Sequence, residues 1–309
     1  MRIGEFTYSD DGSRLFNIKY NQSSHPMPPT FFKYYALSSN GIDALTKSYI
    51  YASHPNQMND PFDCDKDMIT IDDNETLKVL LGNLYQEIKD SLGSQEFATF
   101  LSLAFNTLVY KKCGILSLTT NPTNSLMWAH YAGKNGVCVE FNIQDFPFNF
   151  YGPFPINYVE TLPIVKTSLI GLKQAMAIQC TVKQSIWSYE DEWRILIPNQ
   201  GGIDMKSYGY WSENINTEDD HDRKFAYPTK AIKRVILGCE FVAPRDVKKL
   251  SNNVILTTTL SEEKCRLLEH IEKHNILTSI LHKCGGGHYD TIDVAIEKRD
   301  NQSFIISEL

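Results

Sequence analysis

Residues 187–195 read Trp-Ser-Tyr-Glu-Asp-Glu-Trp-Arg-Ile and run from a loop into a strand. Side chains alternate between the two faces of a strand, so Glu190, Glu192 and Arg194 should share one face. Two carboxylates and an arginine on one face are costly to bury without a purpose. The stretch therefore predicts either a functional site or a structural ion pair, in which Arg194 contacts Glu192 or Asp60.

Strands and helices alternate irregularly on both sides of this stretch, which predicts an α+β fold. The apolar patterns indicate strands at 31–35, 49–53, 113–118, 136–141, 156–160, 192–197, 224–227, 232–237 and 254–258. They indicate helices at 38–47, 124–132, within 163–182 and at 261–274, followed by two or three strands between 276 and the end of the chain.

The chain divides into three parts. Residues 1–29 are polar and end in a proline-rich segment, so they should form an N-terminal arm and a linker. Residues 30–260 should form the main domain, with a helical hairpin inserted at 74–110 and broken near Gly93. Residues 261–309 should add a helix and strands that pack on the main domain.

The composition is that of an ordinary folded protein. The 309 residues carry 30 Lys+Arg and 37 Asp+Glu, a formal net charge of −7, with 42% hydrophobic and 22% charged residues. These values argue against disordered, collagen-like and coiled-coil classes. The longest uncharged apolar stretch, residues 97–110, is too short to span a bilayer, and the N-terminus lacks a secretory signal, so we expect no membrane association and a cytoplasmic location. Seven dispersed cysteines without a C-x-x-C pair indicate free thiols and no structural zinc.

Familiar nucleotide and metal motifs are absent from the sequence. There is no P-loop, no G-x-G-x-x-G after a strand and no G-x-S-x-G elbow. His270 and His274 have the spacing of a helical metal pair but lack the glutamate of zinc proteases, so a polar helix face is the simpler interpretation. The acidic run at 63–67, with Asp60, indicates either a turn with solvated acids or carboxylates that hold magnesium for phosphodiester cleavage. The second interpretation leaves a metal-dependent nuclease as an alternative function.

Six motifs follow one another along the chain. They are F-K-Y-Y (32–35), I-Y-A-S-H-P-N-Q-M-N-D-P-F-D (50–63), L-M-W-A-H-Y-A-G (126–133), G-V-C-V-E-F (136–141), W-S-Y-E-D-E-W-R-I (187–195) and A-I-K-R-V-I-L-G-C (231–239). In this order they resemble the bacterial family catalogued as domain of unknown function 2971, over about residues 30–239. The family label itself implies little chemistry.

A more distant similarity is to the ADP-ribosyltransferase fold. A strand with a polar residue beside aromatics, a short helix before a strand, an Asn-Asp-Pro turn and a late Glu-x-Glu strand together resemble it. The resemblance implies split β-sheets that hold NAD, as substrate, in the cleft between them. Glu192 and Glu190 match the Glu-x-Glu motif, so the resemblance implies that they are the catalytic residues.

The same resemblance implies a set of NAD-binding residues. They are Lys33, Tyr34, Tyr35, Ser53, Asn59, Asp60, Trp128, His130, Tyr131 and Arg194. Lys33 stands where His or Arg is usual in the first-strand motif, and it lacks the planar donors of arginine. Tyr34, Tyr35 or Trp128 would stack on nicotinamide or adenine. His130 and Arg194 would bind pyrophosphate. An aromatic core without a ligand would explain the tyrosines and the tryptophan equally well.

These similarities imply an ADP-ribosyltransferase-like protein that cleaves NAD and acts as a toxic effector in bacterial anti-phage defence. Cleavage of the N-glycosidic bond passes through an oxocarbenium-like state, which a nearby carboxylate stabilises. The acceptor would be a protein or a nucleic acid, and a partner protein would regulate the activity. Two alternatives stay open: a non-catalytic module that senses a nucleotide or a partner, and the metal-dependent nuclease.

Overall fold

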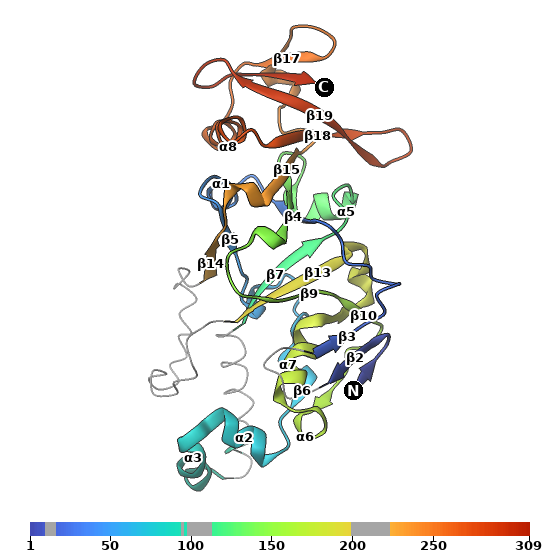
Figure 1. The fold of residues 1–309 in the computed structure, drawn as a ribbon, viewed down its shortest axis with the longest axis vertical. Helices are drawn as coiled ribbons and strands as arrows, with labels where there is room; N and C mark the ends of the chain where they lie inside the picture. The colour runs from blue at the N-terminus through green and yellow to red at the C-terminus, as the bar shows by residue number, and fades with distance from the viewer. Residues whose placement is uncertain (10–16, 94–95, 98–112, 199–222) are drawn as a thin grey trace.

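A computed structural model describes residues 1–9, 17–93, 96–97, 113–198 and 223–309 (Figure 1). Its largest element is an eleven-stranded mixed sheet with the order β16-β17-β20-β19-β18-β15-β8-β4-β7-β13-β9. These strands are β4 (Phe31–Tyr35), β7 (Cys113–Thr119), β8 (Val137–Phe141), β9 (Tyr151–Pro155), β13 (Glu192–Pro198), β15 (Ile232–Leu237), β16 (Val247–Lys249), β17 (Val254–Thr257), β18 (Leu277–Lys283), β19 (Tyr289–Lys298) and β20 (Phe304–Glu308). Helices accompany the sheet, so the predicted α+β class is confirmed.

The sheet narrows to one residue pair between β4 and β7. On one side, β4 pairs with β8 from Phe31 to Tyr35. On the other side, β7 pairs with β13 along its whole length. Between them, Phe32 pairs with Thr119 and the two strands then diverge. This single pair keeps the eleven strands in one continuous sheet, and the divergence of β4 and β7 opens space beside them.

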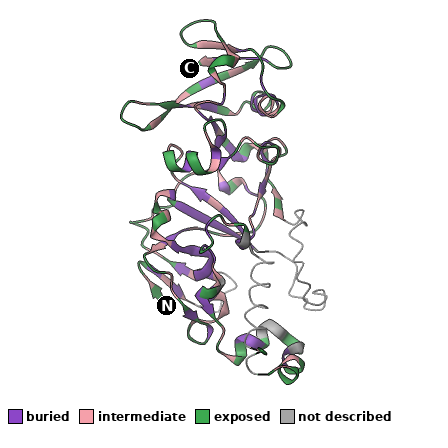
Figure 2. Ribbon diagram, turned by 180° about the vertical axis from the view of Figure 1, so that it is seen from behind, coloured by how far each residue is buried: buried purple, intermediate pink, exposed green. Residues whose placement is uncertain are grey.

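Two helices cover one face of the sheet and form the main core with it. They are α1 (Ser39–Thr46) and α8 (Glu262–Lys273), both of which the sequence predicts. The Ser38 side chain caps α1 by accepting a hydrogen bond from the Gly41 amide at 3.2 Å. Ile42 and Leu268 are fully buried in this core, and Figure 2 shows that buried residues follow the central strands. The apolar faces of the two helices and of the central strands therefore pack against each other in one core.

The N-terminal residues form a small sheet where the sequence predicts an arm. The strands β1 (Arg2–Ile3), β2 (Phe6–Ser9) and β3 (Asn17–Lys19) pair antiparallel. Phe6 and Tyr8 are buried and join a second apolar cluster with α7 (Leu172–Thr181). The prediction was wrong here because Phe6 and Tyr8 alternate in a short, otherwise polar segment, where the period-two signal is weak.

The helical insertion is confirmed in part. The helices α2 (Asn74–Leu81) and α3 (Tyr85–Ser91) are separated by the turn η3 (Gly82–Leu84), so the first predicted helix has an additional break at Gly82, with φ 53°. Glycine adopts such a positive φ at little cost. The predicted break near Gly93 is also present, because α3 ends at Ser91 and residues 96–97 are helical again. The second half of the predicted hairpin, residues 98–110, lies outside the described residues.

Short elements complete the described chain. Paired short strands are β5 (Tyr49–Tyr51) with β14 (Lys224–Ala226), β6 (Ile69–Thr70) with β11 (Val165–Lys166), and β10 (Asn157–Val159) with β12 (Val182–Gln184). Short helices include α5 (Ser125–Met127), the π-helix η4 (Trp128–Ala132), α6 (Thr167–Ile170) and the 3₁₀ helix η6 (Ser185–Glu190). Residues 261–309 extend the main sheet, because β18 pairs in parallel with β15. No helix among the described residues is long and apolar enough to cross a membrane.

We expect Gly136→Ala to destabilise the fold by about 1–3 kcal/mol. A Cβ at this position would lie 2.2 Å from the Ala132 carbonyl oxygen and 2.4 Å from that of Tyr35, where η4 meets β8. The matched control is Gly285→Ala, whose Cβ would meet nothing within 4 Å. Denaturant melts of both variants measure the difference. Equal midpoints for the two variants would contradict this account of the junction.

Candidate functional site

A cavity of about 230 Å³ opens where β4 and β7 diverge. Its walls come from these strands, from the loop at 53–63, from η4, and from the ends of β12 and β13. Eight of the twelve residues that the sequence predicts for the site line this cavity: Lys33, Tyr34, Ser53, Asn59, Tyr131, Glu190, Glu192 and Arg194. Segments far apart in the sequence therefore converge as predicted.

Asp191, which has a left-handed backbone conformation, brings Glu190 and Glu192 to the same cavity. Glu190 is the last residue of η6, and Asp191 follows with φ 46° before β13 begins at Glu192. This turn keeps both carboxylates on the cavity although only Glu192 belongs to the strand. The Thr119 hydroxyl holds the turn by donating to the Glu190 carbonyl at 2.7 Å. The predicted shared face is therefore present, with a turn in place of one continuous strand.

Arg194 lies completely buried at the floor of the cavity, and every donor of its guanidinium has an acceptor. Its Nε and Nη2 donate to the two oxygens of Glu192 at 2.7 and 3.1 Å. Its Nη1 and Nη2 donate to the two oxygens of Asp63 at 2.8 and 2.5 Å. Nη1 also donates to the Cys180 carbonyl at 2.9 Å. A guanidinium has five N–H donors, so none is left for a pyrophosphate.

Arg194 does not pair with Asp60. Asp60 is buried and its Oδ1 accepts from the Phe62 amide at 2.9 Å, which makes a tight turn, while its Oδ2 has no hydrogen-bond partner. The predicted ion pair of Arg194 with Glu192 is confirmed, and the predicted pair with Asp60 is wrong. Because Asp60 is engaged in the turn itself, Asp63, three residues later, reaches the arginine.

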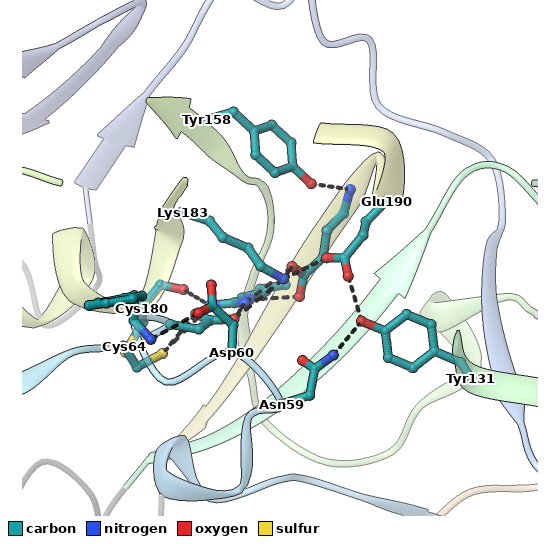
Figure 3. A network of polar contacts seen from close by, with 12 residues as sticks. Asn59, Asp60, Cys64, Tyr131, Tyr158, Cys180, Lys183 and Glu190 are labelled. Atoms are coloured by element: carbon teal, nitrogen blue, oxygen red, sulfur yellow. Dashed lines mark hydrogen bonds and ion pairs between the residues drawn. The ribbon is translucent and has the colours of Figure 1, made fainter. Parts of the chain in front are cut away.

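Lys183 is the second buried cation of the site. Its Nζ lies 2.5 Å from Glu190 Oε2, 3.2 Å from Glu192 Oε2 and 3.4 Å from Asp63 Oδ2. Its side chain is 3% exposed. Lys183 donates hydrogen bonds to Glu190 and Glu192, and its contact with Asp63 is an ion pair. Two cations and three carboxylates form one buried network, drawn in Figure 3.

Glu190 is the carboxylate with the fewest protein partners in this network. Its Oε2 accepts from Lys183, and its Oε1 accepts from the Tyr131 hydroxyl at 2.5 Å. Asn59 in turn donates to the Tyr131 oxygen at 3.0 Å. Figure 3 shows this line of contacts from Lys183 to Asn59, at the edge of the network. A carboxylate has about four lone-pair sites, so Glu190 keeps acceptor capacity for a ligand.

The π-helix η4 places Tyr131 over Glu190. The Asn124 side chain caps the preceding turn by accepting from the Leu126 and Met127 amides. The Gly133 amide then donates to the Trp128 carbonyl at 2.7 Å, the wide spacing of a π-turn. Single π-turns often occur at functional sites, where they redirect one side chain. Here the redirected side chain is the phenol that binds Glu190.

Burial and charge move the pKa values of the two glutamates in opposite directions. Burial and the charge of Glu192 raise the pKa of Glu190, against the opposing effects of Lys183 and Tyr131. Burial would also raise the pKa of Glu192, but Arg194 and Lys183 together lower it to about 2. Glu192 is therefore fixed as an anion, and Glu190 is the carboxylate of the pair that gains a proton more easily.

Lys33 is the third cation on the cavity and has a different environment. Its Nζ donates to the Ser117 carbonyl at 3.3 Å. Burial lowers the pKa of Lys33 to about 8, and the charge of Glu192 offsets part of this effect. No ion pair of Lys33 with a carboxylate is found among the described residues.

The remaining four predicted residues do not line the cavity. Besides Asp60, these are Tyr35, Trp128 and His130. Tyr35 lies in the main core. Trp128 packs edge-on against Tyr34, with ring centroids 5.3 Å apart, and its Nε1 donates to the Pro122 carbonyl. His130 is exposed and contacts the rings of Tyr131 and Tyr189. Of the three predicted aromatic stacking residues, Tyr34 therefore lines the cavity, Trp128 packs behind it and Tyr35 lies in the core.

Sequence reasoning missed Lys183, and it placed Asp63 in a turn or a magnesium site without pairing it with Arg194. A weak signal exists for each of them. Asp63 closes the Asn-Asp-Pro-Phe-Asp segment one turn after Asp60. Lys183 follows Val182 in an apolar segment where an unpaired lysine would be costly. Neither signal names the partner, because the partner lies on another element.

The described residues were compared with the requirements of a metal site and of a disulfide. Within the described ranges, no group of three or more His, Cys, Asp and Glu side chains is arranged to hold a metal ion. Asp63, Glu190 and Glu192 instead contact Lys183 or Arg194. The six cysteines whose side chains the structure describes are free thiols.

Comparison with known families adds one match. Residues 127–195 match the family model described as protein of unknown function (DUF2971). The matched range contains Tyr131 and four of the five members of the buried network, Lys183, Glu190, Glu192 and Arg194. Neither the curated proteins nor the solved structures gave a match. The predicted DUF2971 resemblance is supported over this range, and the ADP-ribosyltransferase resemblance stays a prediction.

We expect Asp63→Asn to destabilise the protein by about 3–5 kcal/mol, because it leaves the buried Arg194 short of one charge partner. The matched control is Asp60→Asn, which keeps the oxygen that accepts from Phe62 and should cost under about 1 kcal/mol. Urea melts of both variants give the two free energies of unfolding. A larger loss for Asp60→Asn would show that the ion pair has been assigned to the wrong aspartate.

We expect Lys33→Met to remove a pH-dependent contribution to stability. The Lys33 pKa is about 8 in the folded chain and ordinarily 10.5, so the unfolded chain binds more protons between these values. The wild type should therefore gain stability relative to Lys33→Met as the pH rises through that window, by at most about 3 kcal/mol. Urea melts between about pH 7 and about pH 10 measure the difference. A difference that stays constant with pH would contradict the lowered pKa.

Proposed function

We propose that this protein is an ADP-ribosyltransferase-like enzyme that cleaves NAD in the cavity beside Glu190. The observation that carries the proposal is the buried carboxylate of Glu190, which faces the cavity with acceptor capacity to spare. Glu192 was expected to be the principal catalytic residue. Because both of its oxygens are bound to cations, we assign the ligand contact to Glu190 and the positioning of Arg194 and Lys183 to Glu192.

The charge of the network suits an oxocarbenium-like transition state. Three carboxylates against two cations leave a net charge of −1 in a buried place, as counted from Asp63, Glu190, Glu192, Lys183 and Arg194. A negative field fixed in advance stabilises positive charge that develops on a ribose. Glu190 would accept a hydrogen bond from a ribose hydroxyl and lie near the developing charge.

The cavity suits one end of a dinucleotide. Its volume of about 230 Å³ is below that of sites that enclose a whole drug-sized ligand, about 300–1,000 Å³. The nicotinamide and its ribose would enter the cavity, and the rest of NAD would extend outward. The ring of Tyr34 offers a stacking surface for nicotinamide. Lys33 is the lining cation left to attract a phosphate oxygen, in place of Arg194 and His130.

A non-catalytic nucleotide sensor is the second candidate. The observation that favours it is the complete pairing of Arg194 and Lys183, which resembles a rigid structural core more than a working acid or base. Such a protein would bind NAD or a related nucleotide without cleaving it. The role of toxic effector in anti-phage defence, the protein or nucleic-acid acceptor and the regulatory partner protein remain predictions that depend on cleavage being found.

We expect the purified protein to release nicotinamide from NAD, and Glu190→Gln to slow the release by about 10²–10³-fold. The variant should fold, because the amide oxygen can accept from Lys183 and the amide NH2 can donate to the Tyr131 oxygen, while Lys183 keeps Glu192 and Asp63. Chromatography of labelled NAD measures release, and added cell extract reveals transfer to an acceptor. The matched control is Glu240→Gln, an exposed glutamate that pairs with Lys134.

Three results are distinguishable in this experiment. Release by the wild type and by Glu240→Gln, but not by Glu190→Gln, supports the enzyme. Saturable binding of NAD without release supports the sensor. Neither binding nor release would overturn both proposals for the cavity.

A further inference from the structure

Lys183 is a buried cation for which neither the sequence nor the family match gives a role. It lies on β12, outside the Glu190–Arg194 segment, and its ammonium group is the charged partner of Glu190. The ring of Trp187 lies 5.0 Å from its Nζ and closes one side of its environment. No other cation is found within ion-pair distance of Glu190 among the described residues.

We propose that Lys183 is a positioning residue, whose ammonium group keeps Glu190 ionised and turned toward the cavity. The chemical consequence of this role rests on the proposed function, because it matters when Glu190 accepts a hydrogen bond from a ribose. The electrostatic part does not depend on NAD and can be measured without it.

The hydrogen-bond geometry makes Lys183 irreplaceable by Arg194. All five donors of Arg194 are directed at Glu192, Asp63 and the Cys180 carbonyl, so the guanidinium has none for Glu190. Without Lys183, the only polar side-chain contact of Glu190 within the described part of the chain is the Tyr131 phenol. A buried carboxylate with one neutral donor takes up a proton more readily than one beside an ammonium group.

The charge count points the same way. Removing Lys183 leaves three carboxylates against one guanidinium, and the net charge of the network changes from −1 to −2. Protonation of Glu190 restores −1, and burial with the charge of Glu192 already favours that proton. Other titratable and charged groups also face this network. Tyr131 on η4, Tyr189 on η6 and Glu192 on β13 act on Glu190 together with Lys183 on β12. Arg194 on β13, Asp63 on the loop, Tyr158 on β10 and Lys33 on β4 face the rest of the network.

A protonated Glu190 would change what the cavity recognises. The carboxylic acid would donate one hydrogen bond and would carry no charge to stabilise a developing cation. Lys183 thus acts on the ligand through Glu190 and needs no contact of its own with the reacting atoms.

The experiment titrates Glu190 in the full-length chain. Lys183→Met removes the ammonium group and keeps an unbranched apolar stem. Glutamate labelled with ¹³C at the carboxyl carbon gives a resonance for Glu190 that the Glu190→Gln variant identifies by its loss. We expect the Glu190 titration to move up by at least about one to two pH units in Lys183→Met. The control is Lys47→Met, which removes an exposed cation paired with Asp43 and should leave that titration unchanged. An unchanged titration in Lys183→Met overturns the proposal.

A second variant covers the case in which Lys183→Met unfolds. Lys183→Met with Glu190→Gln has the same net network charge as the wild type, so it should recover most of the melting temperature that Lys183→Met loses. If the double variant melts no higher than Lys183→Met, Lys183 supports the fold independently of Glu190 and the proposal is overturned.

The pH dependence of NAD cleavage separates this proposal from the proposed function. If the wild type cleaves NAD, the acidic limb of its rate profile should move to higher pH in Lys183→Met by the same shift as the Glu190 titration. An unmoved limb overturns the positioning role. If the wild type does not cleave NAD, the proposed enzyme fails, and the carboxyl titration still decides whether Lys183 controls Glu190.

Discussion

The hydrogen bonds of the Arg194 guanidinium to two carboxylates are the interaction on which the centre of this structure depends. One edge of the guanidinium meets Glu192 on its own strand, and the other meets Asp63 on the loop that follows β5, while the Cys180 carbonyl closes the end of α7. Planar arginine suits this arrangement because two carboxylates can each take two parallel donors. The guanidinium thereby connects β13, the loop after β5 and the end of α7, which do not pair as strands at this point.

A buried ion network of this kind fixes the positions of its side chains, but burying the charges costs free energy. Buried ion networks often contribute less stability than apolar residues of similar volume would, because each charge must be taken out of water. This cost is offset here because all five N–H donors of Arg194 have acceptors. Lys183 donates to Glu190 and Glu192 and lies within ion-pair distance of Asp63. The same requirement makes the network sensitive to single substitutions, since any missing partner leaves a charge without compensation. A site built on such a network is rigid before a ligand arrives.

Sequence reasoning succeeded where a local pattern carries the information. The strands at β4, β8 and β15 and the helices α1 and α8 follow from apolar period and capping residues. It failed where the decision lies between distant segments. No local pattern says that Arg194 prefers Asp63 to Asp60, or that a lysine from β12 reaches Glu190. The π-turn under Tyr131 and the short N-terminal sheet were missed because both depend on tertiary contacts more than on propensity.

The single residue pair between β4 and β7 gives the sheet a hinge line. Strands that share a long ladder move together, whereas β4 and β7 share one backbone pair, Phe32 with Thr119, and are otherwise joined through side chains. One half carries β4 and continues through β8 and β15 to the C-terminal strands, and the other carries β7 and the buried ions. A small rotation about this pair would change the width of the cavity.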